Sequence, residues 1–431
     1  MLRATSGSGN GSSSTTSLSP YTAPLNVGFA GDSIGGQWAG QWSPTTTYNI
    51  GVSQSPILWA AIELYPCDLQ FVMNTAVGGT SSSHLLTVQL AQLQALTVKP
   101  DLLIVQSLQN DYMGTISGAD GYVANVTSYA TQALAAGVKM VVICSHPPKS
   151  SVPDVASVLV YANRKLELFC RATKGTFYCD VFGAWRNTQA ADTNGVPWKG
   201  VVATVTGYTE DGTHPNALAA RAAAPLILPI LKALARPINP MPAAYVAYDN
   251  VNLPFNNVFG ANGGMIGTGG QYNGVNNANV AGNSQNNGDR WTLVDGSGIV
   301  ATPTIVTGAD GYLYQQLTFS GTATADVVVN LNFAYFNDIA SGQFFNEAII
   351  ETQNLIGPYN IQWVNANLLM GTNKLSRIDG TTTRFHIRSQ PSTFSNSGFV
   401  TRNYSLQLSF ANGTLASGAI RLGRTGLYRV G

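Results

Sequence analysis

From Leu25 to about Ala235, short apolar runs alternate with segments whose apolar residues recur at helical spacing. The runs have the length of buried strands, and the segments between them are long enough for helices. A chain that alternates in this way folds into a parallel sheet covered on both faces by helices, so the sequence predicts an α/β domain. The expected strands are 25–30, 69–74, 102–107, 139–145 and 176–181, and the expected helices are 85–96, 122–136, 155–173 and 217–234.

The composition and the hydrophobic pattern of the chain change after a cluster of prolines between 237 and 242. Helical periodicity stops, Asn and Gly become frequent in 250–288, and short alternating runs follow between turn residues, which is typical of a β-sandwich. Its opening, an Asn-Leu-Pro-Phe sequence followed after a Gly-rich loop by Asp289-Arg290-Trp291, resembles jelly-roll carbohydrate-binding modules. The expected strands are 290–294, 312–319, 326–333, 348–351, 384–388, 405–410 and 419–422.

The two sequence patterns, one of alternating strands and helices and one of strands alone, predict the domain organisation. The 431 residues are enough for at least two domains with their own cores. We expect a flexible linker or attachment arm at 1–22, which is rich in Ser, Thr and Gly, and a Pro-rich linker at 237–247. The α/β domain then spans 23–236, and a β-sandwich domain for carbohydrate binding or oligomerisation spans 248–431.

The charge balance argues against a nucleic-acid partner. Lys and Arg number 22 and Asp and Glu 21, which gives a net charge of +1 and no basic field for phosphate groups. Charged residues make up 10% of the chain, against about 25% in ordinary soluble domains, and Ser, Thr, Asn and Gln supply the polarity instead. This composition favours an extracellular or virion protein whose hydroxyl and amide groups face sugars.

The amino terminus lacks the pattern of a signal peptide. Residues 1–20 have no apolar core, and no uninterrupted apolar run approaches the roughly 18 residues of a membrane helix. We therefore expect no membrane insertion, and either a mature form or export by another route, such as release inside a phage particle.

All four cysteines, Cys67, Cys144, Cys170 and Cys179, lie in the first half of the chain, and none forms a CxxC pair. Because the spacing of metal sites is absent and Cys144 ends an apolar run, we expect buried thiols, with neither metal nor cofactor. A disulfide between Cys170 and Cys179 stays open as an alternative.

A candidate nucleophile follows the first expected strand. Gly31-Asp32-Ser33 ends that strand in a small-residue turn, at the carboxyl edge where open α/β sheets bind ligands. Taken alone, Gly, Asp and Ser are ordinary turn residues. The assignment therefore depends on partners elsewhere in the chain.

One histidine has the carboxylate neighbour that a general base needs. His214 follows Asp211 by three residues, just before the last helix of the α/β part. Such a turn can fold the carboxylate onto Nδ1 and leave Nε2 facing a nucleophile, although Asp and His are also common turn residues. His84, His146 and His386 have no such neighbour, and we expect them to be structural.

Two further segments at strand ends carry hydrogen-bond donors. Residues 74–80, which include Gly79, follow the second strand, and Asn110 follows the third. A glycine lets a backbone N–H approach a substrate oxygen, and an Asn side chain donates a second bond; the Ser33 N–H adds a third donor for an oxyanion. Each segment alone is readily explained as a strand-terminating turn. Together with Ser33 and His214, they occur in order along one edge of the sheet.

Over residues 25–235 the chain resembles the SGNH subgroup of GDSL-type hydrolases, whose sequence blocks are spread over a flavodoxin-like α/β domain. The matching blocks are Gly31-Asp32-Ser33, Asn74 to Thr80, Asn110-Asp111 and Asp211-x-x-His214. The resemblance implies a three-layer fold with Ser33 as nucleophile, His214 as general base and Asp211 as its orienter. It also implies an oxyanion hole formed by the Ser33 and Gly79 amides and the Asn110 side chain.

One position departs from the family pattern. The third block usually reads Gly-x-Asn-Asp, and here Leu108 takes the glycine position, which leaves open the loop conformation before Asn110. The activity that the resemblance implies is acyl transfer from an ester. The family hydrolyses lipids, thioesters, acetylated sugars and aryl esters, so the fold does not select the substrate.

Three features favour a carbohydrate ester. Trp38, Trp42 and Tyr48 follow the nucleophile and are candidates for lining a sugar-binding pocket, with core packing as an equal alternative. The expected second domain resembles a sugar-binding module, and the polar, weakly charged surface suits a polysaccharide. We therefore predict a serine esterase that removes O-acetyl groups from a surface or cell-wall polysaccharide.

The same features resemble phage tail-spike or virion-fibre proteins that carry an SGNH deacetylase, which implies a homotrimer with other tail proteins as partners. The alternatives are a non-catalytic polysaccharide-binding or structural virion protein on a hydrolase fold, and a secreted lipase or aryl esterase. A glycosidase is disfavoured because glutamates are few and no carboxylate pair is placed for that chemistry.

Overall fold

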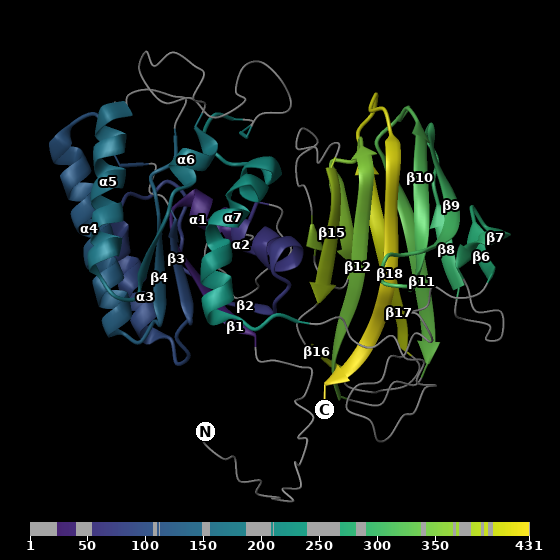
Figure 1. Cartoon of the computed structure of the whole chain (residues 1–431), viewed down its shortest axis with the longest axis horizontal. Coiled ribbons are helices and arrows are strands. Elements are labelled where there is room, and N and C mark those ends of the chain that lie inside the picture. Colours follow the sequence, from purple (N-terminus) through teal and green to yellow (C-terminus); the bar gives the residue numbers. More distant parts are fainter. Residues whose placement is uncertain are drawn as a thin grey trace, which may run out of the picture.

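The computed structural model describes residues 24–39, 54–106, 110–111, 113–148, 156–186, 208–209, 211–238, 268–281, 290–337, 342–364, 368–369, 381–388, 392–394 and 400–430. In these ranges the chain forms an α/β domain and a β-sandwich domain that lie side by side (Figure 1). The expected arm at 1–22 lies outside the described residues.

The α/β domain is built on a five-stranded parallel sheet. Its strands lie in the order β2 (Leu69–Asn74), β1 (Leu25–Gly31), β3 (Leu102–Gln106), β4 (Met140–Cys144) and β5 (Thr176–Cys179). This 2-1-3-4-5 order is that of flavodoxin-like folds, in which ligands bind beyond the carboxyl ends of the strands. The five expected strands are confirmed, and the last ends early because Asp180 caps the helix that follows it.

Helices cover both faces of this sheet and complete the expected three layers. One face carries α3 (Leu90–Ala95), α4 (Ile116–Ala135) and α5 (Ala156–Ala172); the other carries α1 (Ser33–Trp38), α2 (Pro56–Trp59), α6 (Val181–Trp185) and α7 (Ala217–Leu234). Two π-helical segments, η1 (Ala60–Leu64) after α2 and η2 (Leu85–Gln89) before α3, extend these helices.

Short polar side chains begin several helices at the edge where the strands end. Asp32, Thr115 and Asn216 each accept hydrogen bonds from backbone N–H groups in the first turns of α1, α4 and α7. Such caps satisfy donors that a helix leaves unpaired. The caps therefore fix where Ser33 and the segment after His214 enter their helices.

Helix α7 is long and apolar enough to cross a membrane by length and composition, and it is the one described helix that passes this test. Its residues Ala219, Ala223 and Ile227 are fully buried in the core of the domain. The broad apolar surface of α7 is therefore packed inside the fold.

All four cysteines are buried free thiols, as expected, and Cys170 is not bonded to Cys179. Cys144 and Cys179 are register partners on β4 and β5. Burial raises the pKa of the Cys170 thiol to about 11, which keeps it protonated at neutral pH.

The second domain is a β-sandwich of two sheets, whose described pairs are antiparallel apart from β6 with β8. The first sheet has the order β15 (Thr381–Arg388), β12 (Gly342–Ile356), β18 (Ser417–Val430), β10 (Leu313–Gly321) and β9 (Ile299–Thr307), with β16 (Ser392–Phe394) also paired to β12. The second has the order β14 (Leu368–Leu369), β13 (Asn360–Val364), β17 (Val400–Phe410), β11 (Val327–Asn337), β8 (Arg290–Val294), β6 (Thr268–Tyr272) and β7 (Val275–Ala281).

The expected sandwich is confirmed, and strand β9 shows why part of it was missed. Pro303 lies inside β9, and proline within a run argues against a strand because it has no N–H for the ladder. Strand β9 is at the end of its sheet, where one side of the strand needs no partner. An edge position therefore accommodates the proline.

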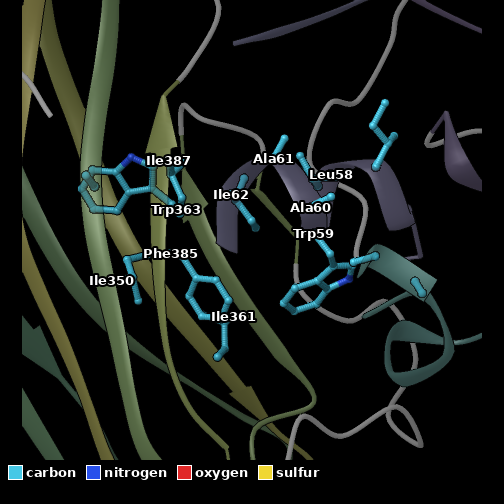
Figure 2. Packing of buried hydrophobic residues seen from close by; sticks show 14 of the residues in the cluster. Leu58, Trp59, Ala60, Ala61, Ile62, Ile350, Ile361, Trp363, Phe385 and Ile387 are labelled. Carbon is cyan, nitrogen blue, oxygen red and sulfur yellow. The ribbon is translucent and has the colours of Figure 1, made fainter. Parts of the chain in front are cut away.

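One hydrophobic core continues from the α/β domain into the sandwich. Trp59 of α2 packs edge-to-face on Phe385 of β15, with ring centroids 5.7 Å apart. Figure 2 shows these two rings next to each other, with Ile361 of β13 beside Phe385 and Ile350 of β12 on the side away from Trp59. The α/β domain therefore covers the β15 edge of the sandwich.

Ion pairs surround this apolar contact. Glu63 of η1 binds Arg221 of α7 at 2.6 Å and accepts a hydrogen bond from the Thr383 hydroxyl. Arg388 of β15 is 1% exposed and contacts Glu347 of its own domain at 2.6 Å and Asp68 of the α/β domain at 3.3 Å. The two domains are therefore joined by buried charge as well as by packing.

The chain leaves α7 along the same interface. The Ile238 N–H donates to the Pro66 carbonyl at 2.8 Å, and Pro237 forms a bridge with Cys67. The expected Pro-rich linker at 237–247 thus begins in paired backbone. Residues 239–247 lie outside the described part of the chain.

Candidate active site

Ser33 lies at the carboxyl end of β1 and begins helix α1. The preceding Asp32 is fully buried and turns the chain into the helix, with Oδ1 accepting the Ile34 N–H at 3.0 Å. Gly31 has φ of 131°, a conformation that favours glycine. The Gly-Asp-Ser sequence therefore makes a sharp turn that leaves Ser33 half-buried at the sheet edge.

The imidazole of His214 joins Ser33 to Asp211. His214 Nε2 is 2.9 Å from Ser33 Oγ, and Nδ1 is 2.6 Å from Asp211 Oδ2. With Nδ1–H donating to the carboxylate, Nε2 accepts the Ser33 hydroxyl proton. The structure thus brings the three predicted residues into one hydrogen-bonded chain.

The backbone around Asp211 fixes its carboxylate. Its Oδ1 accepts the N–H groups of Thr213 and His214, each at 2.8 Å, and the Thr209 hydroxyl at 3.2 Å. Partial burial raises the pKa of Asp211, but the hydrogen bonds from His214 and the two backbone N–H groups outweigh it, so the pKa lies below its ordinary value. Asp211 is therefore ionised at neutral pH.

The two other predicted segments, which carry the candidate oxyanion donors Gly79 and Asn110, lie next to the turn that carries Ser33. Gly79 is exposed with φ of 79°, and a Cβ placed there would meet no atom within 4 Å, so its backbone borders open space. The Asn110 side-chain amide donates to the Thr80 carbonyl at 3.0 Å and lies 3.4 Å from Asp32 Oδ2. Because Asp32 precedes Ser33 and Thr80 follows Gly79, these contacts bring all three candidate donors to one place.

Asp111 supports this loop, a role that the sequence did not indicate. Its two carboxylate oxygens accept the N–H and the hydroxyl of Ser82, both at 2.7 Å, and Asn125 donates to the same hydroxyl at 2.9 Å. Burial raises the pKa of Asp111 despite these bonds. The departure at Leu108 lies outside the described residues, while Asn110 itself is placed.

Of the three aromatic residues that were candidates for lining a sugar-binding pocket, the structure describes Trp38. Trp38 is fully buried and packs edge-to-face on Trp185 at 6.3 Å, which is the core-packing alternative. A side chain with no exposed surface does not line a pocket in this conformation. Trp42 and Tyr48 lie outside the described residues.

The other histidines have structural contacts. His146 is fully buried, and its Nδ1 lies 3.0 Å from the Pro147 carbonyl. His386 is nearly buried in the sandwich, 3.3 Å from Glu347. His84 binds the side chain of Gln89 at 3.1 Å.

Gln89 is a residue near the site that sequence reasoning missed. It is fully buried and bonds to the backbone of Gly31, two residues before Ser33. A signal was present, because Gln89 stands between Leu85 and Leu93 at four-residue spacing, on the apolar face of the helix. A polar side chain at such a position needs buried partners.

The described residues contain no group of three or more His, Cys, Asp or Glu side chains that could hold a metal ion. A serine hydroxyl hydrogen-bonded to an imidazole that a carboxylate orients can carry out acyl transfer. The geometry therefore fits the attack of a serine on a carbonyl group.

No protein-family model and no curated protein matches the chain. Among solved structures, it is similar to a GDSL-like lipase from Bacteroides thetaiotaomicron, at 15% identity and a TM-score of 0.33, over 48% of this chain and 88% of the lipase. It is similar to an acetyl esterase mutant solved with acetate, at 18% identity and a TM-score of 0.32, over 49% of this chain and 97% of the esterase. A family 11 carbohydrate-binding module from Clostridium thermocellum matches 33% of this chain and 88% of its own length, at 16% identity and a TM-score of 0.16.

The strand order and the positions of the sequence blocks agree with one another. Ser33, Gly79 and Asn110 follow β1, β2 and β3, and His214 precedes the last helix of the domain. The α/β part of the chain therefore has a flavodoxin-like fold, with the residues that resemble the SGNH/GDSL blocks at the carboxyl edge of its sheet.

Proposed function

We propose that the protein is a serine esterase that removes O-acetyl groups from a surface or cell-wall polysaccharide. The single observation that carries the esterase assignment is the hydrogen-bonded chain from Ser33 through His214 to Asp211. Asp211 and His214 share one turn, but Ser33 lies 181 residues from His214 on another turn, so local turn formation does not explain the contact between Ser33 and His214.

In the proposed reaction, His214 Nε2 takes the Ser33 proton as Oγ attacks the ester carbonyl. The oxyanion of the tetrahedral intermediate accepts hydrogen bonds from the Ser33 and Gly79 amides and from the Asn110 side chain. His214 then donates its proton to the sugar oxygen as the bond from this oxygen to the carbonyl carbon breaks, which releases the sugar hydroxyl and leaves an acetyl group on Ser33. Water repeats these steps and releases acetate, while Asp211 stabilises the imidazolium each time it forms.

The choice of a sugar ester rests on composition and on the second domain. Charged residues are 10% of the chain, and the surface draws its polarity from hydroxyl and amide groups, which suit contact with a neutral polysaccharide. Trp38 does not contribute to this argument because it is buried. The sandwich domain is fixed to the hydrolase domain by a shared core, so it could hold a long chain at a constant position relative to Ser33.

The test is release of acetate from a panel of O-acetylated bacterial and plant polysaccharides, with Ser33→Ala as the control. We expect acetate from at least one polymer, none from the variant, and no new reducing ends. New reducing ends without acetate would identify a glycosidase. Turnover of lipid or aryl esters with no polysaccharide substrate would leave the esterase assignment and remove the proposed substrate.

The proposed setting is extracellular or on a virion, with the chain as part of a homotrimeric tail spike or fibre. The low charge and the Gly- and Asn-rich second domain support this setting. Light scattering of the purified chain tests it: a trimer is expected, and a strict monomer at all concentrations would oppose it.

A further inference from the structure

The residue that joins β1 to the nucleophile turn is held by a side chain from another helix. Gly31 precedes Asp32 and Ser33, and its φ of 131° marks the point where the chain leaves the strand. Its N–H donates to Gln89 Oε1 at 2.9 Å, and its carbonyl accepts from Gln89 Nε2 at 2.8 Å. One primary amide therefore binds both backbone polar groups of this residue.

Both polar atoms of the Gln89 amide have further polar neighbours. Besides Gly31, Oε1 lies 3.3 Å from the Thr75 hydroxyl, and Nε2 lies 3.1 Å from His84 Nδ1. An amide nitrogen cannot accept a hydrogen bond, so in this contact Gln89 Nε2 is the donor. With Oε1 and Nε2 both bonded to the backbone of Gly31, the buried amide is held in one orientation.

The same contacts reach the loop that carries Gly79. The Gly31 carbonyl also accepts the Val77 N–H at 3.1 Å, and Thr75 lies four residues before Gly79. Gln89 itself ends the π-helical segment η2, an irregularity that is often found near functional sites. The glutamine thus ties the turn before Ser33 to the strand end before Gly79.

We propose that Gln89 is a positioning residue that sets the distance between the Ser33 nucleophile and the Gly79 oxyanion donor. The proposal rests on the proposed function, because it assigns the catalytic roles to these two residues. Misplacement of a reacting group by about 1 Å can cost about 100-fold in rate. Loss of the Gln89 amide therefore acts on the chemical step more than on the affinity for a small substrate.

The experiment compares Gln89→Met with Gln315→Met in the full chain, with p-nitrophenyl acetate as substrate. Gln315 is the matched control: it is fully buried in the sandwich, accepts the Ala281 N–H at 2.7 Å and donates to the Thr304 carbonyl at 2.9 Å. We expect Gln89→Met to lower kcat by about 10- to 100-fold with KM nearly unchanged, and Gln315→Met to leave both constants unchanged. Equal kcat in the two folded variants, or an equal loss in both, would overturn the proposal.

Hydrogen–deuterium exchange gives a second readout that does not need turnover. Gln89→Met should speed exchange in peptides covering 25–39 and 74–80, while Gln315→Met should do so only in the sandwich. If the unaltered chain neither turns over ester nor reacts with a fluorophosphonate, the proposed function fails, and exchange alone decides the positioning role. If Gln89→Met does not fold, Gln89→Glu is measured in its place, because it keeps an acceptor for the Gly31 N–H and loses the donor to the Gly31 carbonyl. A several-fold loss in kcat supports the proposal, and an unchanged kcat overturns it.

Discussion

Asp211 at the sheet edge and Asp68 at the domain interface are both carboxylates next to a basic side chain, yet their pKa values move in opposite directions. The Asp211 side chain is 54% exposed, and hydrogen bonds from His214 and two backbone N–H groups outweigh its partial burial and lower its pKa. The Asp68 side chain is 11% exposed, and burial raises its pKa even though Arg388 opposes the change. Exposure decides which effect is larger.

The difference separates a region built for chemistry from one built for cohesion. At the sheet edge, polar groups stay partly exposed and are held by the backbone, so they remain available to a substrate. At the interface, Trp59, Phe385 and Arg388 are all but excluded from water, so their partners are other residues of the chain. Changes at the edge should therefore alter rate, and changes at the interface should alter stability.

The largest expected effect is at the edge. His214→Ala removes the base that Ser33 needs, and loss of a triad member typically lowers kcat by about 10⁴- to 10⁶-fold. Thermal unfolding should change little because the His214 side chain is near the surface, at 19% exposure. Steady-state kinetics with p-nitrophenyl acetate and a melting curve measure the two effects. A fall in Tm with kcat preserved would contradict the expectation that the sheet edge controls rate and the interface controls stability.

At the interface, Arg388→Met should lower the free energy of unfolding by about 3–5 kcal/mol, since breaking a buried ion pair leaves Glu347 without its cation. Arg384→Met is the matched control on the same strand. Arg384 is 40% exposed and pairs with Glu351 and Asp310 inside the sandwich, so about 1 kcal/mol is expected. Urea unfolding measures the free energy of unfolding of both variants. Equal decreases would show that Arg388 is not excluded from water at the interface.

The same contrast explains what the sequence could predict. Gly31-Asp32-Ser33 ends a strand and Asp211-x-x-His214 precedes the helix α7. Both are local sequences, so their residue types and order along the chain were enough to place them on one edge. The contact of Asp68 with Arg388 joins residues 320 apart, and no local pattern carries that register. Helix α2 and η1 were missed as well, because residues 56–62 are all buried and show no amphipathic period.

Asn110→Ala tests the oxyanion side of the edge. Removing one oxyanion donor raises the barrier by about 2.7–4 kcal/mol, which corresponds to a fall in kcat of about 10²- to 10³-fold. Some activity should remain, since the Ser33 and Gly79 amides are untouched. The kcat of Asn110→Ala is compared with that of His214→Ala. A decrease in kcat as large as that of His214→Ala would point to a collapsed loop around residue 110.

The smallest expected effect is a pH dependence at the interface. Burial, and then the charge of Asp68, raise the pKa of the Cys67 thiol from 9.0 to about 12. The unfolded thiol ionises above pH 9 while the folded one stays protonated, so stability present below pH 9 is lost as the pH rises towards 12, by about 1.4 kcal/mol per pH unit from this group. Between pH 8 and 10, urea unfolding of Cys67→Ala should show a smaller loss than that of the unaltered chain; an identical loss would mean that Cys67 is not buried.

The most direct test of the central claim is the site of covalent modification by a fluorophosphonate. Peptide mass spectrometry of the treated chain should find one phosphonyl group per molecule, on Ser33, with no label in Ser33→Ala and much slower labelling in His214→Ala. A folded chain in which Ser33 stays unmodified, or in which another serine takes the label equally well in Ser33→Ala, would contradict the assignment of Ser33, His214 and Asp211 as a catalytic triad.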